Sequence, residues 1–299
     1  MPDIPFYIQN WNPEALHLAG PLAVRWYGLA YLGGLVAGWL LLRRFSRKGW
    51  FAIPAPETQA YTVYLVLFGV FLGGRLGYLV FYNLSEFIQD PTLLFRIWEG
   101  GMASHGGVIG VTLYMLWVAR RRRIPVWNLS DNTVCVVPAG LALGRFANFV
   151  NGELWGRVTE VPWAVVFPRE AVLAPGSPLS GEPPYPLESI RIAWHLELLQ
   201  PRHPSQLYQM VGEGLWLLAL LLILRHTRWS RARPGRLTWV FLLGYAVVRI
   251  LAEFFREPDP GIPLWFGWMT RGQALSLLMV VGAAVVAWWP KGEGKEGRR

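Results

Sequence analysis

Residues Gly144–Gly156 read GRFANFVNGELWG and close a long apolar run. Arg145 and Asn148 are three positions apart, so they share one face of the helix that this run predicts. An ionised arginine inside or near hydrocarbon costs at least ~2.5 kcal/mol. Asn151 and Glu153 follow where the helix should meet water. The stretch therefore indicates a polar site at a membrane boundary, and an arginine that merely snorkels from a helix end is the alternative.

Similar apolar runs recur along the whole chain. It has 299 residues, of which 53% are hydrophobic, with 17 Trp and 23 Pro. Runs of about 20 apolar residues are typical of transmembrane helices. The predicted spans are residues 21–42, 59–82, 101–119, 127–150, 204–224, 237–255 and 270–290. We therefore expect an all-α polytopic membrane protein, with a single seven-helix transmembrane domain over residues 1–299.

The basic residues indicate which side of the membrane each loop occupies. The net charge is +9, and most of the 28 Lys and Arg residues fall in 43–50, 120–123, 225–236 and the tail from Lys291. Because cytoplasmic loops carry an excess of Lys and Arg, the N-terminus is predicted outside and the C-terminus in the cytoplasm. These clusters explain the basic composition, so no nucleic-acid partner is expected. The first twenty residues contain no Lys or Arg and do not resemble a cleavable signal peptide.

Conspicuous polar side chains gather near the outer ends of the predicted helices. An anionic ligand in the outer leaflet would explain several costly arginines at one depth, because guanidinium groups bind phosphate in a bidentate manner. The set comprises Tyr27, Arg75, His105, Arg145, Asn148, Glu153, His203, Gln206, Arg249, Glu253 and Arg256. A phospholipid headgroup is the candidate ligand.

The spacing of these charges leads to expectations about their pairing. Arg249, Glu253 and Arg256 follow at i, i+4 and i+7, which predicts one helical face with surplus positive charge. Glu213 lies deeper in its helix and is expected to pair with an internal partner such as Arg75. The arginines that fall inside the predicted spans are Arg25, Arg75, Arg145, Arg249 and Arg271.

Residues 157–203 form the single long segment between predicted helices. Prolines are frequent in it, and PWAVVF at 162–167 predicts a short strand. We expect a loop-rich extracytoplasmic cap between helices 4 and 5, of the kind that admits or covers a substrate. Cys135 is the only cysteine and lies between two valines, so it is predicted to be a small core residue. No metal site and no cofactor are expected.

A resemblance to a known family rests on motifs distributed over nearly the whole chain. They are RWYG at 25–28, GGRLGY at 73–78, HGGVIG at 105–110, GRFANFVNGELWG at 144–156, RHPSQLYQ at 202–209 and EFFREPD at 253–259. In this order they resemble the motifs of the prolipoprotein diacylglyceryl transferases, whose signature is similar to the central stretch. The 157–203 cap is the region for which these motifs provide no alignment.

The resemblance implies a multi-pass enzyme of the bacterial cytoplasmic (inner) membrane, with its active site facing the extracytoplasmic side. It implies transfer of the diacylglyceryl group from phosphatidylglycerol to the lipobox cysteine in the signal peptide of a preprolipoprotein. The product is a thioether, and glycerol phosphate is released. The implied partners are thus phosphatidylglycerol, lipobox-containing preprolipoproteins and the surrounding membrane lipids.

Carried over motif by motif, the resemblance also implies roles. Arg145 and Arg249 would be the essential arginines at the lipid headgroup, and His105 and Tyr27 would be further catalytic residues. The other implied headgroup positions are Asn148, Glu153, Gly156, Glu253, Arg256 and His203. Because a free thiol has a pKa of ~8.5, it needs either a base or a positive field to supply the thiolate, and His105 is the candidate base. The arginines would stabilise charge on the leaving phosphate.

Other classes of membrane protein fit less well. A transporter or flippase for anionic phospholipids would also place arginines in the membrane, but it needs polar groups along a path to both sides. A retinal protein is excluded, because the only lysines are Lys48, Lys291 and Lys295 and none lies in mid-membrane. An intramembrane protease would carry a serine or HExxH motif, which is absent. A purely structural scaffold would not explain cations gathered at one depth.

Overall fold

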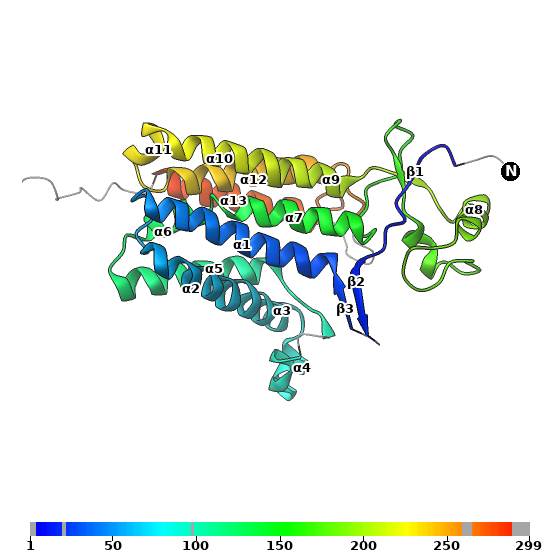
Figure 1. Ribbon diagram of the computed structural model, residues 1–299, viewed down its shortest axis with the longest axis horizontal. Coiled ribbons are helices and arrows are strands. Elements are labelled where there is room, and N and C mark those ends of the chain that lie inside the picture. Colours follow the sequence, from blue (N-terminus) through cyan, green and yellow to red (C-terminus); the bar gives the residue numbers. More distant parts are fainter. Residues whose placement is uncertain (1–3, 20–21, 97–98, 259–264, 289–299) are drawn as a thin grey trace, which may run out of the picture. The chain divides into compact units, whose positions relative to one another are not determined.

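The computed structural model describes residues 4–19, 22–96, 99–258 and 265–288 and is mainly helical (Figure 1). Within these residues, each predicted span corresponds to one helical segment of 18 or more residues. The single helices are α1 (Trp26–Arg47), α5 (Ser104–Arg122), α12 (Arg236–Glu253) and α13 (Arg271–Trp288). The composite segments are Ala55–Tyr82, Val126–Val150 and Ser205–His226. The predicted mainly helical character is confirmed.

Each composite segment changes its helical geometry along its length. The segment Ala55–Tyr82 contains η1 (Ala55–Glu57), α2 (Thr58–Tyr64), the π-helix η2 (Leu65–Leu72) and α3 (Gly73–Tyr82). The segment Val126–Val150 contains α6 (Val126–Thr133) and α7 (Val137–Val150). The segment Ser205–His226 contains α9 (Ser205–Gln209), the π-helix η6 (Met210–Trp216) and α10 (Leu217–His226). Wider π-turns inside α-helices are rare and occur frequently at functional sites.

Among the described residues, four helical segments are long and apolar enough to cross a membrane: Ala55–Tyr82, Val126–Val150, Ser205–His226 and Arg271–Trp288. The segment α12 is as long as α13 but carries more charge, namely Arg236, Arg249 and Glu253. The helices α1 and α5 end in arginines and contain several glycines and aromatic residues. Four helical segments of this length and composition indicate a multi-pass membrane protein.

The chain divides into two compact units. Unit 1 comprises Met1–Gly34 and Val137–Arg299, and unit 2 comprises Leu35–Val136. Helix α1 begins in unit 1 and continues into unit 2. The shorter helices of unit 2 are α4 (Leu84–Gln89) and η3 (Pro91–Leu94), and α11 (Arg228–Ala232) belongs to unit 1.

In unit 2, η2 and α3 cross α5 through glycine residues. A Cβ atom at Gly77 would lie 2.5 Å from the Cα of Gly106, so only glycine permits this backbone approach. Arg75 of α3 is buried and donates to the main-chain carbonyls of Leu93, at 3.1 Å from Nε, and of Arg96, at 2.8 Å from Nη2. The proposed pairing of Arg75 with Glu213 is therefore wrong, because nearby carbonyls satisfy this guanidinium.

The first predicted span, residues 21–42, begins before the helix does, because α1 starts at Trp26. Residues Leu22–Arg25 form strand β3, which pairs antiparallel with β2 (Glu14–Ala19) before α1 begins. Arg25 is half exposed, and its Nη1 lies 3.3 Å from Glu182 Oε1. The expectation that Arg25 lies inside a membrane span is wrong, because a short apolar run does not distinguish a strand from a helix.

The segment 157–203 folds as part of unit 1. Its strand β4 (Val165–Val166) confirms the strand predicted from PWAVVF and lies between β1 (Tyr7–Ile8) and β5 (Pro201–Arg202), parallel to β1 and antiparallel to β5. The helices η5 (Pro168–Leu173) and α8 (Leu187–His195) follow (Figure 1). A small apolar core joins these elements; it contains Val166, Ala171, Leu179, Tyr185, Ile190, Ala193 and Leu199. The segment 157–203 therefore has an apolar core despite its many prolines.

Candidate active site

Arg145 of α7 is paired with a buried carboxylate of η6. Its Nε and Nη2 both donate to Glu213 Oε2, at 3.2 and 3.1 Å. The Glu213 side chain is 0% exposed, whereas 17% of the Arg145 side chain is exposed. Close helix packing makes this contact possible, because a Cβ at Gly214 would lie 2.6 Å from the Cβ of Ala142. Glu213 was expected to have an internal partner, and Arg145 is that partner.

Arg249 of α12 contacts the same carboxylate and a second one. Its Nη1 lies 2.9 Å from Glu253 Oε2 and 3.9 Å from Glu213 Oε1. These three atoms are buried, and apart from these ion-pair contacts none makes a hydrogen bond with another described residue. A buried polar atom without a hydrogen bond is costly, and such atoms recur at ligand sites. The Arg145–Glu213–Arg249–Glu253 set, here called the arginine cluster, thus retains unused hydrogen-bonding capacity.

A glycine of α13 covers one side of the arginine cluster. A Cβ at Gly272 would lie 2.9 Å from Arg249 Nη2 and 3.0 Å from Glu253 Oε1. Any side chain there would displace the ion pair. Gly272 therefore lets the first turn of α13 pack directly over it.

Tyr245 belongs to this cluster and was missed by the sequence analysis. It lies one helical turn before Arg249 on α12 and within electrostatic range of both arginines and both carboxylates of the cluster. Its i, i+4 spacing to Arg249 was the available signal. An aromatic residue in an apolar helix is nevertheless common, so the spacing alone did not distinguish it.

The end of α7 folds back on itself and brings Glu153 to Asn148. Gly152 and Leu154 adopt positive φ values of 62° and 58°, which allows the tight reversal. Asn148 Nδ2 then donates to Glu153 Oε1 at 2.8 Å, and Asn151 Nδ2 donates to the same oxygen at 3.4 Å. A non-glycine residue with positive φ is uncommon and is often found at functional sites. The predicted clustering of these polar residues is present in the structure.

Gly156 joins three segments of unit 1. Its N–H donates to His203 O at 2.9 Å, and it forms an antiparallel bridge with Arg256. A Cβ at Gly156 would lie 2.5 Å from the carbonyl oxygens of both His203 and Phe255. The structure thus gives Gly156 a packing role between the cap and the ends of α7 and α12.

Arg256 lies beyond the helix on which it was expected. The helix α12 ends at Glu253, so Arg256 is part of an extended bridge and does not continue the face of Arg249. The expectation of surplus positive charge on that face is therefore wrong. It also fails because Glu213, on another helix, adds a second carboxylate next to Arg249. Two arginines and two carboxylates balance in the arginine cluster.

His203 lies at the base of the cap, before α9. Its Nδ1 is 3.1 Å from the hydroxyl of Tyr208, which also accepts from Trp163 Nε1 at 2.7 Å. Partial burial lowers the pKa of the His203 imidazole, because desolvation disfavours its charged form. The predicted neighbour Gln206 donates to Glu153 O at 2.7 Å, which connects α9 to the turn after α7.

Two other predicted residues have aromatic surroundings. The hydroxyls of Tyr27 and Tyr31 are 3.2 Å apart on α1, and Tyr27 lies within electrostatic range of Glu153 and Arg145. His105 lies in the first turn of α5 in unit 2, with its ring centroid 4.9 Å from that of Phe81. Among the described residues, no group of three or more His, Cys, Asp or Glu side chains is arranged to hold a metal ion.

Comparison with known proteins identifies the family. The family model described as prolipoprotein diacylglyceryl transferase matches residues 13–289. A phosphatidylglycerol–prolipoprotein diacylglyceryl transferase from Rhizobium meliloti (strain 1021) is 44% identical over 275 residues, which cover 90% of this chain and 89% of the relative. The protein of the same name from Agrobacterium fabrum (strain C58 / ATCC 33970) is 42% identical over 276 residues, 90% of this chain and 89% of that protein. The resemblance inferred from the motifs is confirmed, and this chain belongs to the prolipoprotein diacylglyceryl transferase family.

Proposed function

We propose that this protein transfers the diacylglyceryl group of phosphatidylglycerol to the lipobox cysteine of preprolipoproteins, the first step of lipoprotein maturation. The names of the relatives support the two substrates and the transferase class. The structural observation that carries the proposal is the arginine cluster, in which two guanidinium groups of different helices converge on the buried Glu213. Such an arrangement presents N–H donors of fixed direction to an anionic headgroup.

The phosphate would be bound by donors that the cluster leaves unused. Arginine has five N–H donors, and Arg145 uses two of them on Glu213. The remaining donors of Arg145 and those of Arg249 would hold the phosphate oxygens. Because the cluster has as many carboxylates as arginines, this binding depends on directed hydrogen bonds more than on net charge.

Glu153 provides a place for the glycerol headgroup. Its Oε1 accepts from Asn148 and Asn151, which fixes the orientation of the carboxylate. Its Oε2 would accept hydrogen bonds from the free hydroxyls of the glycerol. Tyr27, within electrostatic range of Glu153, would border the same site.

The reaction proceeds by attack of the cysteine thiolate on the carbon of the diacylglyceryl group that bears the phosphate. A carbon–sulfur bond forms, the carbon–oxygen bond to the phosphate breaks, and glycerol phosphate leaves with the electron pair. Arg145 and Arg249 would stabilise the charge that develops on the leaving oxygen, an effect that is often the largest in catalysis. His105 is the proposed base that takes the thiol proton.

The proposed topology has seven membrane-spanning helices, an outer N-terminus and the 157–203 cap on the extracytoplasmic side of the bacterial inner membrane. The long helices α1, α5 and α12 would complete the spans, with their charged ends in the interfaces. The basic loops 43–50, 120–123 and 225–236 would then face the cytoplasm, in agreement with the positive-inside rule.

A mass assay tests the function directly. The purified protein in detergent is mixed with phosphatidylglycerol and a lipobox peptide that contains one cysteine. We expect the peptide to gain one diacylglyceryl group and an equal amount of glycerol phosphate to appear. A peptide with serine in place of cysteine, and phosphatidylcholine in place of phosphatidylglycerol, are the controls. Bound lipid without transfer would contradict the proposal and favour an anionic phospholipid transporter.

A further inference from the structure

Unit 2 has an apolar groove of about 870 Å³ beside the crossing of η2–α3 with α5. Glycine residues form its floor, because Gly73 and Gly77 meet Gly106 and Gly110 with no side chains between them. The larger residues beside this crossing form two walls. Phe68, Leu72 and Leu76 line one wall, and Ile109, Leu113 and Trp117 line the other.

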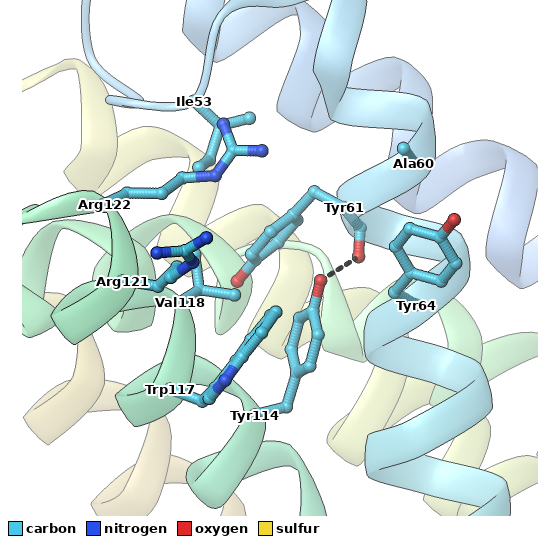
Figure 2. Close-up of a pocket in the computed structure, with 9 residues that line it drawn as sticks. All are labelled: Ile53, Ala60, Tyr61, Tyr64, Tyr114, Trp117, Val118, Arg121 and Arg122. Atoms are coloured by element: carbon cyan, nitrogen blue, oxygen red, sulfur yellow. Dashed lines mark hydrogen bonds between the residues drawn. The ribbon is translucent and has the colours of Figure 1, made fainter.

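A second cavity of about 420 Å³ adjoins the groove, and Figure 2 shows the residues that line this cavity. The groove and this cavity share Tyr64, Tyr114 and Trp117 among their lining residues. Arg121 and Arg122, in the last turn of α5, line the second cavity only. Figure 2 shows both arginine side chains extending from α5 beside Tyr61. One continuous surface thus leads from apolar walls to two guanidinium groups.

The two arginines differ in their pairing. Arg122 forms an ion pair with Glu57. Arg121 makes no hydrogen bond or ion pair with any other residue that the structure describes. No acidic residue is among the described residues that line this cavity. Arg121 therefore provides an uncompensated positive charge at the end of an apolar groove.

The dimensions of the groove suit one acyl chain. Along α5 it extends from Gly106 to Trp117, which is about 16 Å at 1.5 Å per residue. This is roughly half of the ~30 Å hydrocarbon core, the depth of a single leaflet. Tyr64 and Trp117 lie at the arginine end, and such aromatic residues favour the membrane interface.

We propose that this groove binds one acyl chain of an anionic phospholipid whose phosphate is held by Arg121. The site differs from the transfer site described above. Arg121 is separated from His105 by about 24 Å along α5, so a headgroup at Arg121 is far from the proposed base. The bound lipid is accordingly a resident ligand of unit 2 and not the substrate.

Photo-crosslinking of the full-length protein tests this site. The probe is phosphatidylglycerol with a diazirine on one acyl chain, and phosphatidylcholine with the same chain is the comparison. We expect labelling on the peptides that contain Phe68 and Leu113, stronger for phosphatidylglycerol by roughly tenfold, as for one charge-assisted hydrogen bond. Arg121→Gln should reduce this labelling to the phosphatidylcholine level. Arg120→Gln, which removes the same charge beside the cavity without lining it, should leave the labelling unchanged.

A second variant tests the groove separately from the charge. Leu113→Trp fills the groove while Arg121 is retained, and it should abolish labelling at Phe68. Equal labelling by the two lipids in the unaltered protein, or full labelling of Arg121→Gln, would overturn the proposal and leave only the general lipid annulus. Because the readout is the position of the label, failure of the transferase assay would not affect this result.

Discussion

Glu213 is the residue on which both arginines of the cluster depend. It is fully buried, and its two oxygens face Arg145 and Arg249 from different helices. Removing one partner of a buried ion pair leaves an uncompensated charge, which typically costs about 3–5 kcal/mol. Glu213 therefore holds the guanidinium groups in position as well as balancing their charge.

Glu213→Gln should lower both stability and activity. The amide has nearly the same shape but leaves Arg145 without its counter-charge, so we expect a loss of about 3–5 kcal/mol of unfolding free energy. Thermal unfolding in detergent and the transfer assay measure the two effects. Glu257→Gln, at a half-exposed carboxylate 3.4 Å from Arg202, is the matched control and should change neither property measurably. A stable, fully active Glu213→Gln variant would contradict the positioning role.

Arg145→Lys should retain the charge but lose the directed hydrogen bonds. Lysine cannot present two parallel donors to Glu213 Oε2 and further donors to a phosphate. We expect kcat to fall by about 10²-fold or more, as for the loss of one preorganised donor to a developing oxyanion. The same substitution at Arg228, an exposed arginine of α11, is the control. Normal turnover of Arg145→Lys would exclude the bidentate clamp.

At the scale of elements, glycine residues decide which backbones approach each other. In unit 2 they allow α3 to cross α5, and in unit 1 Gly214 brings η6 to α7 and so Glu213 to Arg145. Gly156 does the same for the segments around His203 and Phe255. Each of these contacts depends on the absence of a side chain, so a glycine-to-alanine substitution, which adds one methyl group, tests it.

Gly156→Ala should separate the cap from the end of α12. The new Cβ would lie 2.5 Å from two carbonyl oxygens that belong to backbone and cannot rotate away. We expect a marked loss of thermal stability and faster proteolysis within 157–203. Gly144→Ala is the control in the same motif, because a Cβ there meets nothing within 4 Å. Alanine in that helical position should be neutral or stabilise by roughly 0.5–1 kcal/mol. Equal effects of the two substitutions would show that the crowding at Gly156 is unimportant.

At the scale of the whole molecule, the proposed orientation can be tested with single cysteines. Cys135 is buried and can be replaced by serine to give a cysteine-free background. Glu160 in the cap and Arg228 in α11 are both exposed positions of unit 1. We expect Glu160→Cys to react with a membrane-impermeant maleimide in intact spheroplasts, and Arg228→Cys to react only after permeabilisation. The opposite pattern would reverse the predicted topology.

Three features could be predicted from the sequence: the approximate positions of the long helices, the family and most of the polar residues at the site. Apolar runs of about 20 residues have few alternatives in a membrane, because every backbone polar group must be bonded within the segment. The family could also be inferred from the order of the motifs from RWYG to EFFREPD, since a motif depends on residue identity alone. The predicted start of the first span failed at Arg25, where strand β3 continues the apolar run.

Which charged side chains pair with each other depends on tertiary packing and could not be predicted from the sequence. Glu213 pairs with Arg145 and not with Arg75, because the π-helix η6 and Gly214 set the approach of two helices that are distant in sequence. Arg256 does not lie on the same helical face as Arg249, because α12 ends at Glu253. Tyr245 lies near the arginine cluster because it is one turn before Arg249 on the same helix. The spacing of residues along one helix can be counted in the sequence, so contacts within a helix are predictable. The partner of a buried charge depends on long-range packing, since residues remote in sequence supply it.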